Sequence, residues 1–248
     1  MRVLVTNDDG IDSPGLYALA RAAASVDWEV LVAAPSTEAS GTGTSFASTA
    51  GRAPIPLDRR SVEGFEAIAV PAHPSLISFI ACLGGFGFKP DLVLSGVNLG
   101  ANTSTGILHS GTIGAALTAG VRGVSALAVS LDVEWDGPKP LWDTATEVAA
   151  AVLPTLVEMP AGSVLSLNVP NAPTVRGIEW ASIAPVSPYQ VRVEADGDSV
   201  RLRGGLTDLE PVPGTEVAWL ASGHAALTAL HSVGALPTSD LPSPAWPA

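Results

Sequence analysis

Five short apolar runs rich in β-branched residues lie along the first two thirds of the chain, separated by stretches whose apolar residues have helical spacing. The runs predict buried strands at residues 2–6, 29–34, 91–94, 125–130 and 164–169, the last being the final core strand. The stretches between them predict helices at residues 15–24, 74–84, 110–119 and 143–157, and residues 45–57 and 66–70 have the pattern of shorter strands. Strands that alternate with helices indicate an α/β fold: a three-layer, mostly parallel sheet with right-handed crossovers.

The pattern changes beyond about residue 170. Residues 191–203 alternate between apolar and polar positions around an Asp-Gly pair, which predicts a β-hairpin. Because an isolated hairpin is only marginally stable in water, we expect it to pack on another surface, such as a second subunit. The proline-rich end, residues 238–248, is expected to fray. We therefore divide the chain into a core at residues 1–175 and a C-terminal hairpin and tail at residues 176–248, the latter an oligomerisation element.

The first turn of the chain is its most unusual stretch. The apolar run at residues 2–6 stops at Asn7-Asp8-Asp9-Gly10, and Ser13 and Pro14 then suit the N-cap and first position of a helix. Two adjacent carboxylates thus follow a buried strand, and in a parallel sheet this place is the ligand crevice at the carboxyl ends of the strands. The plainer alternative is a polar loop whose acids cap the next helix.

Composition limits the partners of such a site. The 248 residues are 47% hydrophobic, enough for a large core, and the net charge of -12 argues against a nucleic-acid polymer as partner. An acidic protein that handles phosphates needs metal ions or backbone amides. The single Cys82 fits a reducing compartment and is expected to be a buried, inert thiol. Neither a signal peptide nor a bilayer-spanning run is evident, so we expect a soluble cytoplasmic protein without membrane contact.

Further polar residues follow the other predicted strands. Ser40 comes after the second strand, and Asn98 and Asn102 come after the strand at residues 91–94. With Asp8 and Asp9 they form an all-oxygen set of the kind that Mg²⁺ and Mn²⁺ prefer. Taken singly, Ser40 is equally well explained as a loop hydroxyl and Asn98 as a residue that ties down its own loop.

An anion site is predicted beside the metal. Ser110, Gly111 and Thr112 open a predicted helix, whose first N–H groups and positive dipole end would face an anion. A metal ion next to a helix N-terminus makes a sensible phosphate site on an acidic protein, because the ion neutralises phosphate charge and lowers the pKa of a bound water. His109 adjoins this helix and is a candidate for proton transfer, a role that histidine side chains often have near neutral pH, although a structural role is the more common one.

The chain carries four motifs: Val5-Thr-Asn-Asp-Asp-Gly-Ile with Ser13-Pro-Gly, Ala34-Pro with Ser40-Gly, Ser95-Gly-Val-Asn-Leu-Gly-Ala-Asn, and Ser110-Gly-Thr-Ile-Gly-Ala-Ala. Together these motifs resemble the survival protein SurE family. They occur in family order over roughly residues 1–170. The resemblance implies a metal-dependent 5'(3')-nucleotidase, also described as an acid phosphatase, with a Rossmann-like core. It implies that Asp8, Asp9, Ser40 and Asn98 hold one divalent ion, Mg²⁺ or Mn²⁺, per subunit. It also implies a homodimer or homotetramer assembled through the C-terminal hairpin and tail.

The chain departs from the family pattern at several positions. Gly106 and His109 stand where the family usually has Asp and Tyr, and Pro71-Ala-His73-Pro replaces a Pro-Ala-Asp-Cys opening of a helix. These differences bear on substrate preference. The C-terminal Thr-Asp and Gly-Tyr-Val-Ser segments are reduced to Thr215-Glu216 and Gly223-His-Ala-Ala, which bears on assembly.

Three other enzyme classes fit the residues less well. A haloacid-dehalogenase-like phosphatase would show Asp-x-Asp rather than Asn7-Asp8-Asp9. A zinc deacetylase needs histidines near its Asp pair, and the first histidine is His73. A Rossmann dehydrogenase would carry Gly-x-Gly-x-x-Gly after the first strand. A nucleotide-binding module without turnover and a phosphatase that forms an aspartyl-phosphate remain as alternatives.

We therefore predict a phosphomonoesterase that hydrolyses nucleoside monophosphates. Asp8 and Asp9 are its catalytic pair and bind the metal with Ser40 and Asn98. The phosphate contacts Asn102, Ser110, Gly111 and Thr112. We favour attack by water over attack by a carboxylate, because a carboxylate engaged by a cation is a poorer nucleophile.

Overall fold

The computed structural model describes residues 1–51, 53–133, 137–187, 189–206, 209–231 and 233. Its strands are β1 (Arg2–Thr6), β2 (Glu29–Pro35), β3 (Asp58–Val62), β4 (Phe65–Val70), β5 (Leu92–Leu99), β6 (Ser125–Asp132), β7 (Val164–Pro170), β8 (Ile178–Trp180), β9 (Tyr189–Asp196), β10 (Ser199–Leu206) and β11 (Ala225–Leu230). Its helices are α1 (Pro14–Ala24), α2 (Pro74–Cys82), the 3₁₀ helix η1 (Ser104–His109), α3 (Gly111–Val121), α4 (Trp142–Glu158) and α5 (Glu216–Ala221).

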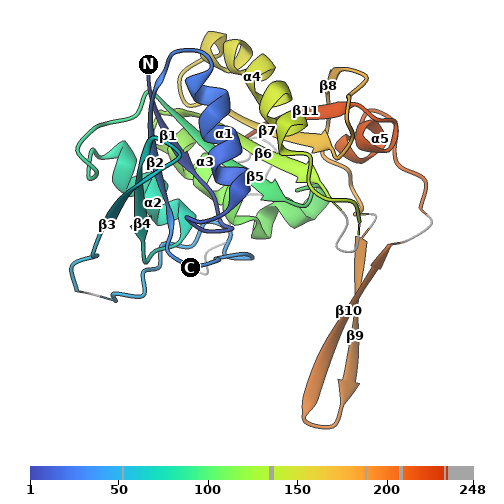
Figure 1. Cartoon of the computed structure of the whole chain (residues 1–248). Coiled ribbons are helices and arrows are strands. Elements are labelled where there is room, and N and C mark those ends of the chain that lie inside the picture. The colour runs from blue at the N-terminus through green and yellow to red at the C-terminus, as the bar shows by residue number, and fades with distance from the viewer. Residues whose placement is uncertain (52, 134–136, 188, 207–208, 232, 234–248) are drawn as a thin grey trace, which may run out of the picture.

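A nine-stranded sheet in the order β3-β4-β2-β1-β5-β6-β7-β11-β8 forms the centre of the molecule (Figure 1). The six strands from β4 to β7 are parallel, whereas β3 pairs antiparallel with β4 and β11 pairs antiparallel with β7. In chain order these six parallel strands follow the 3-2-1-4-5-6 sequence of Rossmann folds, so the strand order reverses between β1 and β5. The predicted mostly parallel α/β sheet is confirmed.

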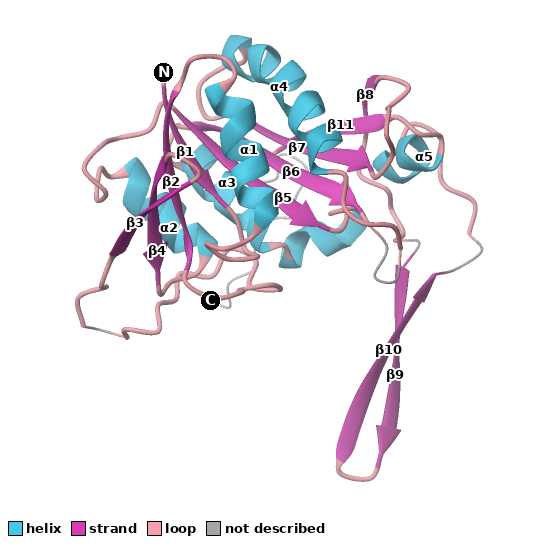
Figure 2. Cartoon of the chain, in the orientation of Figure 1, coloured by secondary structure: helices cyan, strands magenta, loops and turns pink. Residues whose placement is uncertain are grey.

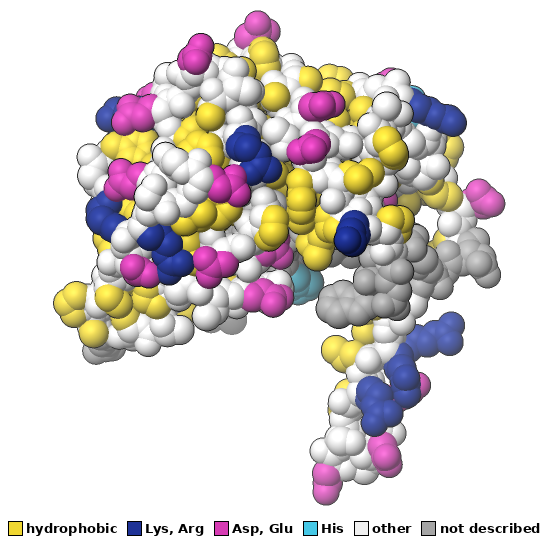
Figure 3. All heavy atoms as spheres, viewed as in Figure 1, with side chains coloured by type: hydrophobic (Ala, Val, Ile, Leu, Met, Phe, Trp, Pro, Cys, Tyr) yellow, Lys and Arg dark blue, Asp and Glu magenta, His cyan; other side chains and the backbone are white. Residues whose placement is uncertain are grey.

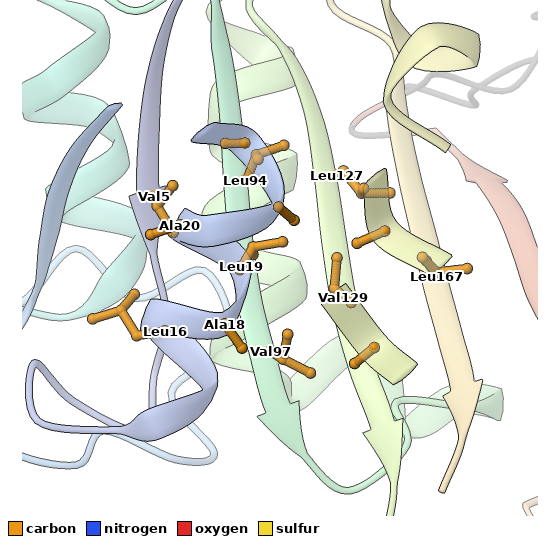
Figure 4. Close-up of a cluster of buried hydrophobic side chains, with 14 of the residues drawn as sticks. Val5, Leu16, Ala18, Leu19, Ala20, Leu94, Val97, Leu127, Val129 and Leu167 are labelled. Atoms are coloured by element: carbon orange, nitrogen blue, oxygen red, sulfur yellow. The ribbon is translucent and has the colours of Figure 1, made fainter. Parts of the chain in front are cut away.

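Helices cover both faces of the sheet and give the three layers (Figure 2). On one face α1 and α4 bury Leu16, Leu19 and Leu153 against the sheet, and Figure 4 shows the α1 leucines above β1 and β5. The other face carries α2 and α3, which bury Ile77 and Ile113. Burying such side chains stabilises the fold by roughly 1.5–3 kcal/mol each.

A glycine sets the distance between α1 and the sheet. A Cβ added at Gly15 would lie 2.2 Å from the carbonyl oxygen of Val97 in β5. The absent side chain therefore lets the first turn of α1 lie directly against the strand. Because α1 follows the Asp8-Asp9 turn at once, this close packing also fixes how that turn leaves the sheet.

Two predictions about strands were wrong. The described residues 45–51 and 53–57 form loops and turns with one isolated bridge, Ser48 to Ala72, and the strand that pairs antiparallel with β4 is β3. Pro54 and Pro56 lack the N–H groups that a sheet strand needs, which explains the loop. The strand at residues 164–169 is not the last of the core either, because β11 follows it in the chain and pairs with β7.

The elements of the C-terminal part lie in two different places. The segments β8, α5 and β11 lie at one edge of the main sheet, whereas β9 and β10 form a separate antiparallel hairpin that projects from the body (Figure 1). The predicted hairpin at residues 191–203 is therefore present and slightly longer than expected. Its residues from Tyr189 to Gly205 are exposed in the single chain. The tail at residues 238–248 lies outside the described residues.

Candidate functional site

The candidate site lies where the strand order reverses. Asp8 and Asp9 follow β1, and Asn98 stands near the end of the neighbouring strand β5. Within the turn, the Asn7 side chain donates to the carbonyl oxygen of Gly10 at 3.0 Å and accepts from its N–H at 3.1 Å. This pair of hydrogen bonds fixes the turn that carries the two carboxylates at the ligand crevice of the sheet.

Asp8 is buried against the start of α3. Its Oδ1 accepts a hydrogen bond from the Thr112 hydroxyl, and its carboxylate also receives the backbone N–H groups of Gly111 and Thr112. Burial raises the pKa of Asp8 above its ordinary value, and these hydrogen bonds oppose the rise. A Cβ at Gly111 would lie 2.8 Å from Asp8 Oδ2, so only glycine lets the helix end approach this closely. The helix N-terminus therefore already holds an anion, the Asp8 carboxylate.

Asp9 is the carboxylate without sufficient partners. Its Oδ2 is buried and accepts no hydrogen bond from any described residue. Burial, followed by the charges of Asp8 and Glu38, raises the pKa of Asp9 to about 6, although the N–H of Leu99 opposes the rise. An uncompensated carboxylate beside a second one creates local negative potential, which a bound cation would neutralise.

The loop after β2 lies over the Asp turn. The N–H of Ala39 donates to the carbonyl oxygen of Asp8 at 2.8 Å, and the hydroxyl of Ser40 donates to Glu38 Oε1 at 2.9 Å. Further along, the loop packs on α3 so closely that a Cβ at Gly114 would lie 2.1 Å from the oxygen of Gly43. The fold therefore carries Ser40 and Glu38 to the edge of the sheet where Asp8 lies.

The two asparagines after β5 have different environments. The Asn98 amide donates to the carbonyl oxygen of Gly100 at 2.7 Å, which leaves its Oδ1 as an acceptor for another group. Asn102 is held between strands, because its side chain donates to the Ser130 hydroxyl at 2.8 Å and its N–H donates to Asn168 Oδ1 at 2.8 Å. Asn98 thus has an oxygen suited to a cation, whereas the amide of Asn102 already contacts protein.

The predicted anion-binding residues at α3 all have partners within the chain. The buried Ser110 hydroxyl accepts from the N–H of Ile113 as the N-cap of α3, while Gly111 and Thr112 contact Asp8. His109 precedes them with an exposed side chain, and its carbonyl oxygen accepts from the N–H of Gly43 at 3.1 Å. Contact of these residues with a phosphate, and proton transfer by His109, remain predictions.

A cleft of about 420 Å³ is formed by the loop that follows β2 and the segment before α2. Its walls are the loop at residues 35–42, the Pro71–His73 segment before α2, and Thr49. Glu38 and Ser40 line the cleft, and the charge of Glu38 also acts on Asp9. Asp8 and Asp9 do not line the cleft themselves, but the loop that forms its wall is bonded to the Asp turn through the N–H of Ala39.

Sequence reasoning missed Glu38 and the contacts between the residues that it did predict. Glu38 lies in the same loop as Ser40, so its position in the chain could have pointed to it. The bond from Thr112 to Asp8 and the packing of Gly111 on Asp8 join segments about a hundred positions apart, and residue types alone do not indicate which groups meet.

Among the described residues, no group of three or more His, Cys, Asp or Glu side chains is arranged to hold a metal ion. The candidate set differs from such a group because it combines two carboxylates with a hydroxyl and an amide oxygen. In the same part of the chain, no helix has the length and apolar character to cross a bilayer.

Comparison with known sequences decides the family. The profile of the family described as survival protein SurE matches residues 3–188, which include every candidate site residue. The chain belongs to the SurE family. The family resemblance of the four motifs is thereby confirmed, and the matched range extends past them to the start of the hairpin.

Individual relatives extend the similarity to most of the chain. A SurE 5'-nucleotidase of Methanopyrus kandleri is 37% identical over 93% of this chain and 91% of its own length. Another, from Citrifermentans bemidjiense, is 34% identical over 93% of both chains. The crystal structure of the SurE protein from Aquifex aeolicus superposes with a TM-score of 0.78 at 26% identity and covers 94% of each chain. This SurE-family chain therefore shares both sequence and fold with its relatives beyond the core.

Proposed function

We propose that this chain is a divalent-metal-dependent phosphomonoesterase that hydrolyses nucleoside 5'(3')-monophosphates to nucleoside and phosphate. The observation that carries the proposal is the adjacent pair Asp8 and Asp9 at the topological switch point, with Asp9 Oδ2 buried and unpartnered among the described residues. The 5'-nucleotidase names of relatives that match nearly the whole chain support the same activity.

The residues present fit a hard divalent cation. Asp8 and Asp9 supply carboxylates, Asn98 an amide oxygen and Ser40 a hydroxyl, the oxygen ligands that Mg²⁺ and Mn²⁺ prefer. The donation of the Ser40 proton to Glu38 leaves the Ser40 lone pairs for another partner. When bound, the ion would neutralise phosphate charge and lower the pKa of a water molecule.

The protein groups fix the positions of the reactants. Thr112 and the N–H groups at the start of α3 hold the Asp8 carboxylate in one orientation. Asn102, bound to Ser130 in β6 and Asn168 in β7, ties its loop to these two strands. Such fixed geometry lowers the entropic part of the barrier for attack in line with the leaving oxygen. We place the phosphate at the Asp pair, beside the Ser110–Thr112 segment that holds Asp8.

Release of inorganic phosphate from AMP and GMP tests the proposal. Purified protein should release phosphate with Mn²⁺ or Mg²⁺, lose this activity in EDTA, and regain it when the ion is returned. A protein that binds the nucleotides in calorimetry without releasing phosphate would be a binding module instead. Full turnover after exhaustive chelation would contradict the metal requirement.

The stereochemistry at phosphorus separates the two hydrolytic routes. Direct attack by water inverts a chiral phosphate ester, whereas an aspartyl-phosphate at Asp8 or Asp9 gives retention through two displacements. We expect inversion, because Asp8 is already engaged by Thr112 and the N-terminus of α3. A phosphoryl group trapped on either aspartate would establish the covalent route.

We further propose a homodimer or homotetramer in which β9 and β10 pack against another subunit. The exposed apolar side chains of the hairpin support this proposal: Tyr189, Val191, Val193, Val200 and Leu202 are each more than half exposed in the single chain. We retain the division of the chain after residue 175 as part of this proposal.

A further inference from the structure

We infer that the cleft beside the Asp pair holds the sugar of the nucleotide, and that Glu38 is a specificity residue that accepts hydrogen bonds from the ribose hydroxyl groups. This inference rests on the proposed function and deepens it, because it names the part of the leaving group that the protein recognises. The substrate class is then a ribosyl phosphate, with the sugar in the cleft and the phosphate at Asp8 and Asp9.

The position of Glu38 in the topology supports the inference. Glu38 lies three residues beyond the end of β2, the strand next to β1 in the 3-2-1-4-5-6 order. In dinucleotide-binding sheets of this order, an acidic side chain in the corresponding region hydrogen-bonds a ribose hydroxyl while the phosphates lie after the first strand. The same division would place a phosphate after β1, at Asp8 and Asp9, and a sugar at Glu38.

The hydrogen bonds of Glu38 leave one oxygen for a ligand. Oε1 accepts from the Ser40 hydroxyl at 2.9 Å, while Oε2 accepts no hydrogen bond from the described residues. The Glu38 side chain is exposed and lines the cleft, so a ligand in the cleft can reach its carboxylate. Ribose hydroxyl groups are donors of the type that a carboxylate accepts strongly.

The rest of the cleft suits a sugar better than a base. Its other polar side chains include Ser36, Thr37, Thr42 and Thr49, and His73 is the one aromatic side chain among the described residues that line it. Hydroxyl-rich walls can exchange hydrogen bonds with a polyol, whereas recognition of a base commonly uses an aromatic platform. The volume of about 420 Å³ lies within the range of small-molecule sites.

Kinetics on matched nucleotides test the role of Glu38. With Mn²⁺, kcat/KM for AMP should exceed that for 2'-deoxy-AMP or for 3'-deoxy-AMP by about 10-fold or more, the scale of one hydrogen bond to a charged group. Glu38→Ala should reduce this ratio to about 1, and Glu38→Gln, which keeps one acceptor oxygen, should give an intermediate ratio. The ratio is informative because general damage to the site, including displacement of Ser40, affects both substrates.

Glu63 offers a matched control. It is an exposed carboxylate that pairs with Arg21 at 2.6 Å and does not line the cleft, so Glu63→Ala should keep the parent ratio. If neither deoxynucleotide is discriminated by the parent, or if Glu38→Ala keeps the full ratio, the inference is overturned.

A binding measurement separates this inference from the proposed activity. Calorimetry on the full chain with Mn²⁺ compares adenosine with 2'-deoxyadenosine and 3'-deoxyadenosine, none of which carries phosphate. A preference for adenosine that disappears in Glu38→Ala supports the sugar site even when no nucleotide is hydrolysed. Equal binding of all three overturns the sugar site, whereas phosphate release from AMP would still support the proposed function.

Discussion

At the scale of single residues, the two aspartates have different roles although they are adjacent. Asp8 is held by Thr112 and the start of α3, whereas Asp9 has a buried oxygen without a partner among the described residues. The fold thus provides hydrogen-bond donors for the Asp8 carboxylate but leaves one buried oxygen of Asp9 without a donor among the described residues. This arrangement is typical of functional sites, where binding of a ligand compensates the local cost.

The raised pKa of Asp9 has a consequence for stability. Because its pKa rises from an ordinary value of 3.8 to about 6 in the folded protein, the folded state binds the proton more tightly than the unfolded state. This contribution to stability is therefore present below about pH 4 and is lost as the pH rises through about 6. Above that pH the metal-free protein carries the repulsion between Asp8 and Asp9.

Asp9→Asn should therefore stabilise the metal-free protein and inactivate the enzyme. In EDTA at pH 8 we expect the free energy of unfolding to rise by roughly 1–3 kcal/mol, which is a few degrees in Tm. Phosphate release should fall by at least about 10²-fold. Added Mn²⁺ should raise the Tm of the parent much more than that of the variant. A variant less stable than the parent in EDTA would contradict the assigned repulsion.

Gly111 should be required for activity because its lack of a side chain leaves room for the Asp8 carboxylate. A Cβ there would lie 2.8 Å from both Cβ and Oδ2 of Asp8, so Gly111→Ala must move the carboxylate or the helix. We expect kcat/KM to fall by about 10²-fold, the cost of a displacement of about 1 Å. Gly177→Ala is the control, since its added Cβ would meet only His224 Cδ2 at an ordinary 3.6 Å, and its rate should stay within about twofold. Equal rates for both variants would disprove the close approach.

At the scale of elements, a buried glutamate joins the end of the chain to the loop before α3. Glu216 at the start of α5 is 3% exposed, and its two oxygens accept from the N–H groups of Ser104 at 2.6 Å and Ala184 at 2.7 Å. Ser104 opens η1 with a positive φ of 55°, a conformation that needs support from its surroundings. Glu216 therefore fixes η1, the segment that leads into Ser110.

Glu216→Ala should destabilise the protein by roughly 2–4 kcal/mol, because two buried N–H groups lose a charged acceptor. Glu216→Gln keeps one acceptor oxygen at similar size and should lose less. Urea unfolding monitored by circular dichroism measures both values. A loss below about 1 kcal/mol in the alanine variant would mean that solvent satisfies these N–H groups and that the link contributes little.

At the scale of the whole molecule, the hairpin of β9 and β10 exposes apolar side chains that no described part of the same chain covers. Its strand register places Val193 opposite Leu202 on one face, and these side chains are 66% and 68% exposed. The opposite face carries Arg192, Arg201 and Arg203, part of the basic side chains seen on the hairpin in Figure 3. Such an apolar face requires cover, and a second copy of the hairpin or sheet would supply it.

Replacing the apolar pair should dissociate the proposed assembly. Light scattering of the parent should give at least a dimer, and Val193→Asp combined with Leu202→Asp should give a monomer with an unchanged circular dichroism spectrum. Gln190→Glu, a change on the polar face of the same strand, is the control and should keep the parent mass. A monomeric parent at micromolar concentration would contradict the assembly, as would an oligomeric double variant.

The central architecture and most of the candidate site could be predicted from the order of residues alone. Apolar runs indicated the strands β1, β2 and β5, because burial in a parallel sheet leaves a continuous local pattern. The location of Asp8 and Asp9 could then be predicted from their place directly after the first strand, since all parallel strands of a sheet end on the same side. These features are local, or depend only on the order of elements.

Contacts between distant segments became visible only in the folded chain. Folding places Glu38 beside Asp9, sets Gly111 against Asp8, and brings β11 into the sheet beside β7. No local pattern in the sequence indicates these contacts, because each depends on how separate elements pack in space. The loop at residues 53–57 shows the converse, since its apolar residues resemble a strand while Pro54 and Pro56 lack the N–H groups that pairing requires.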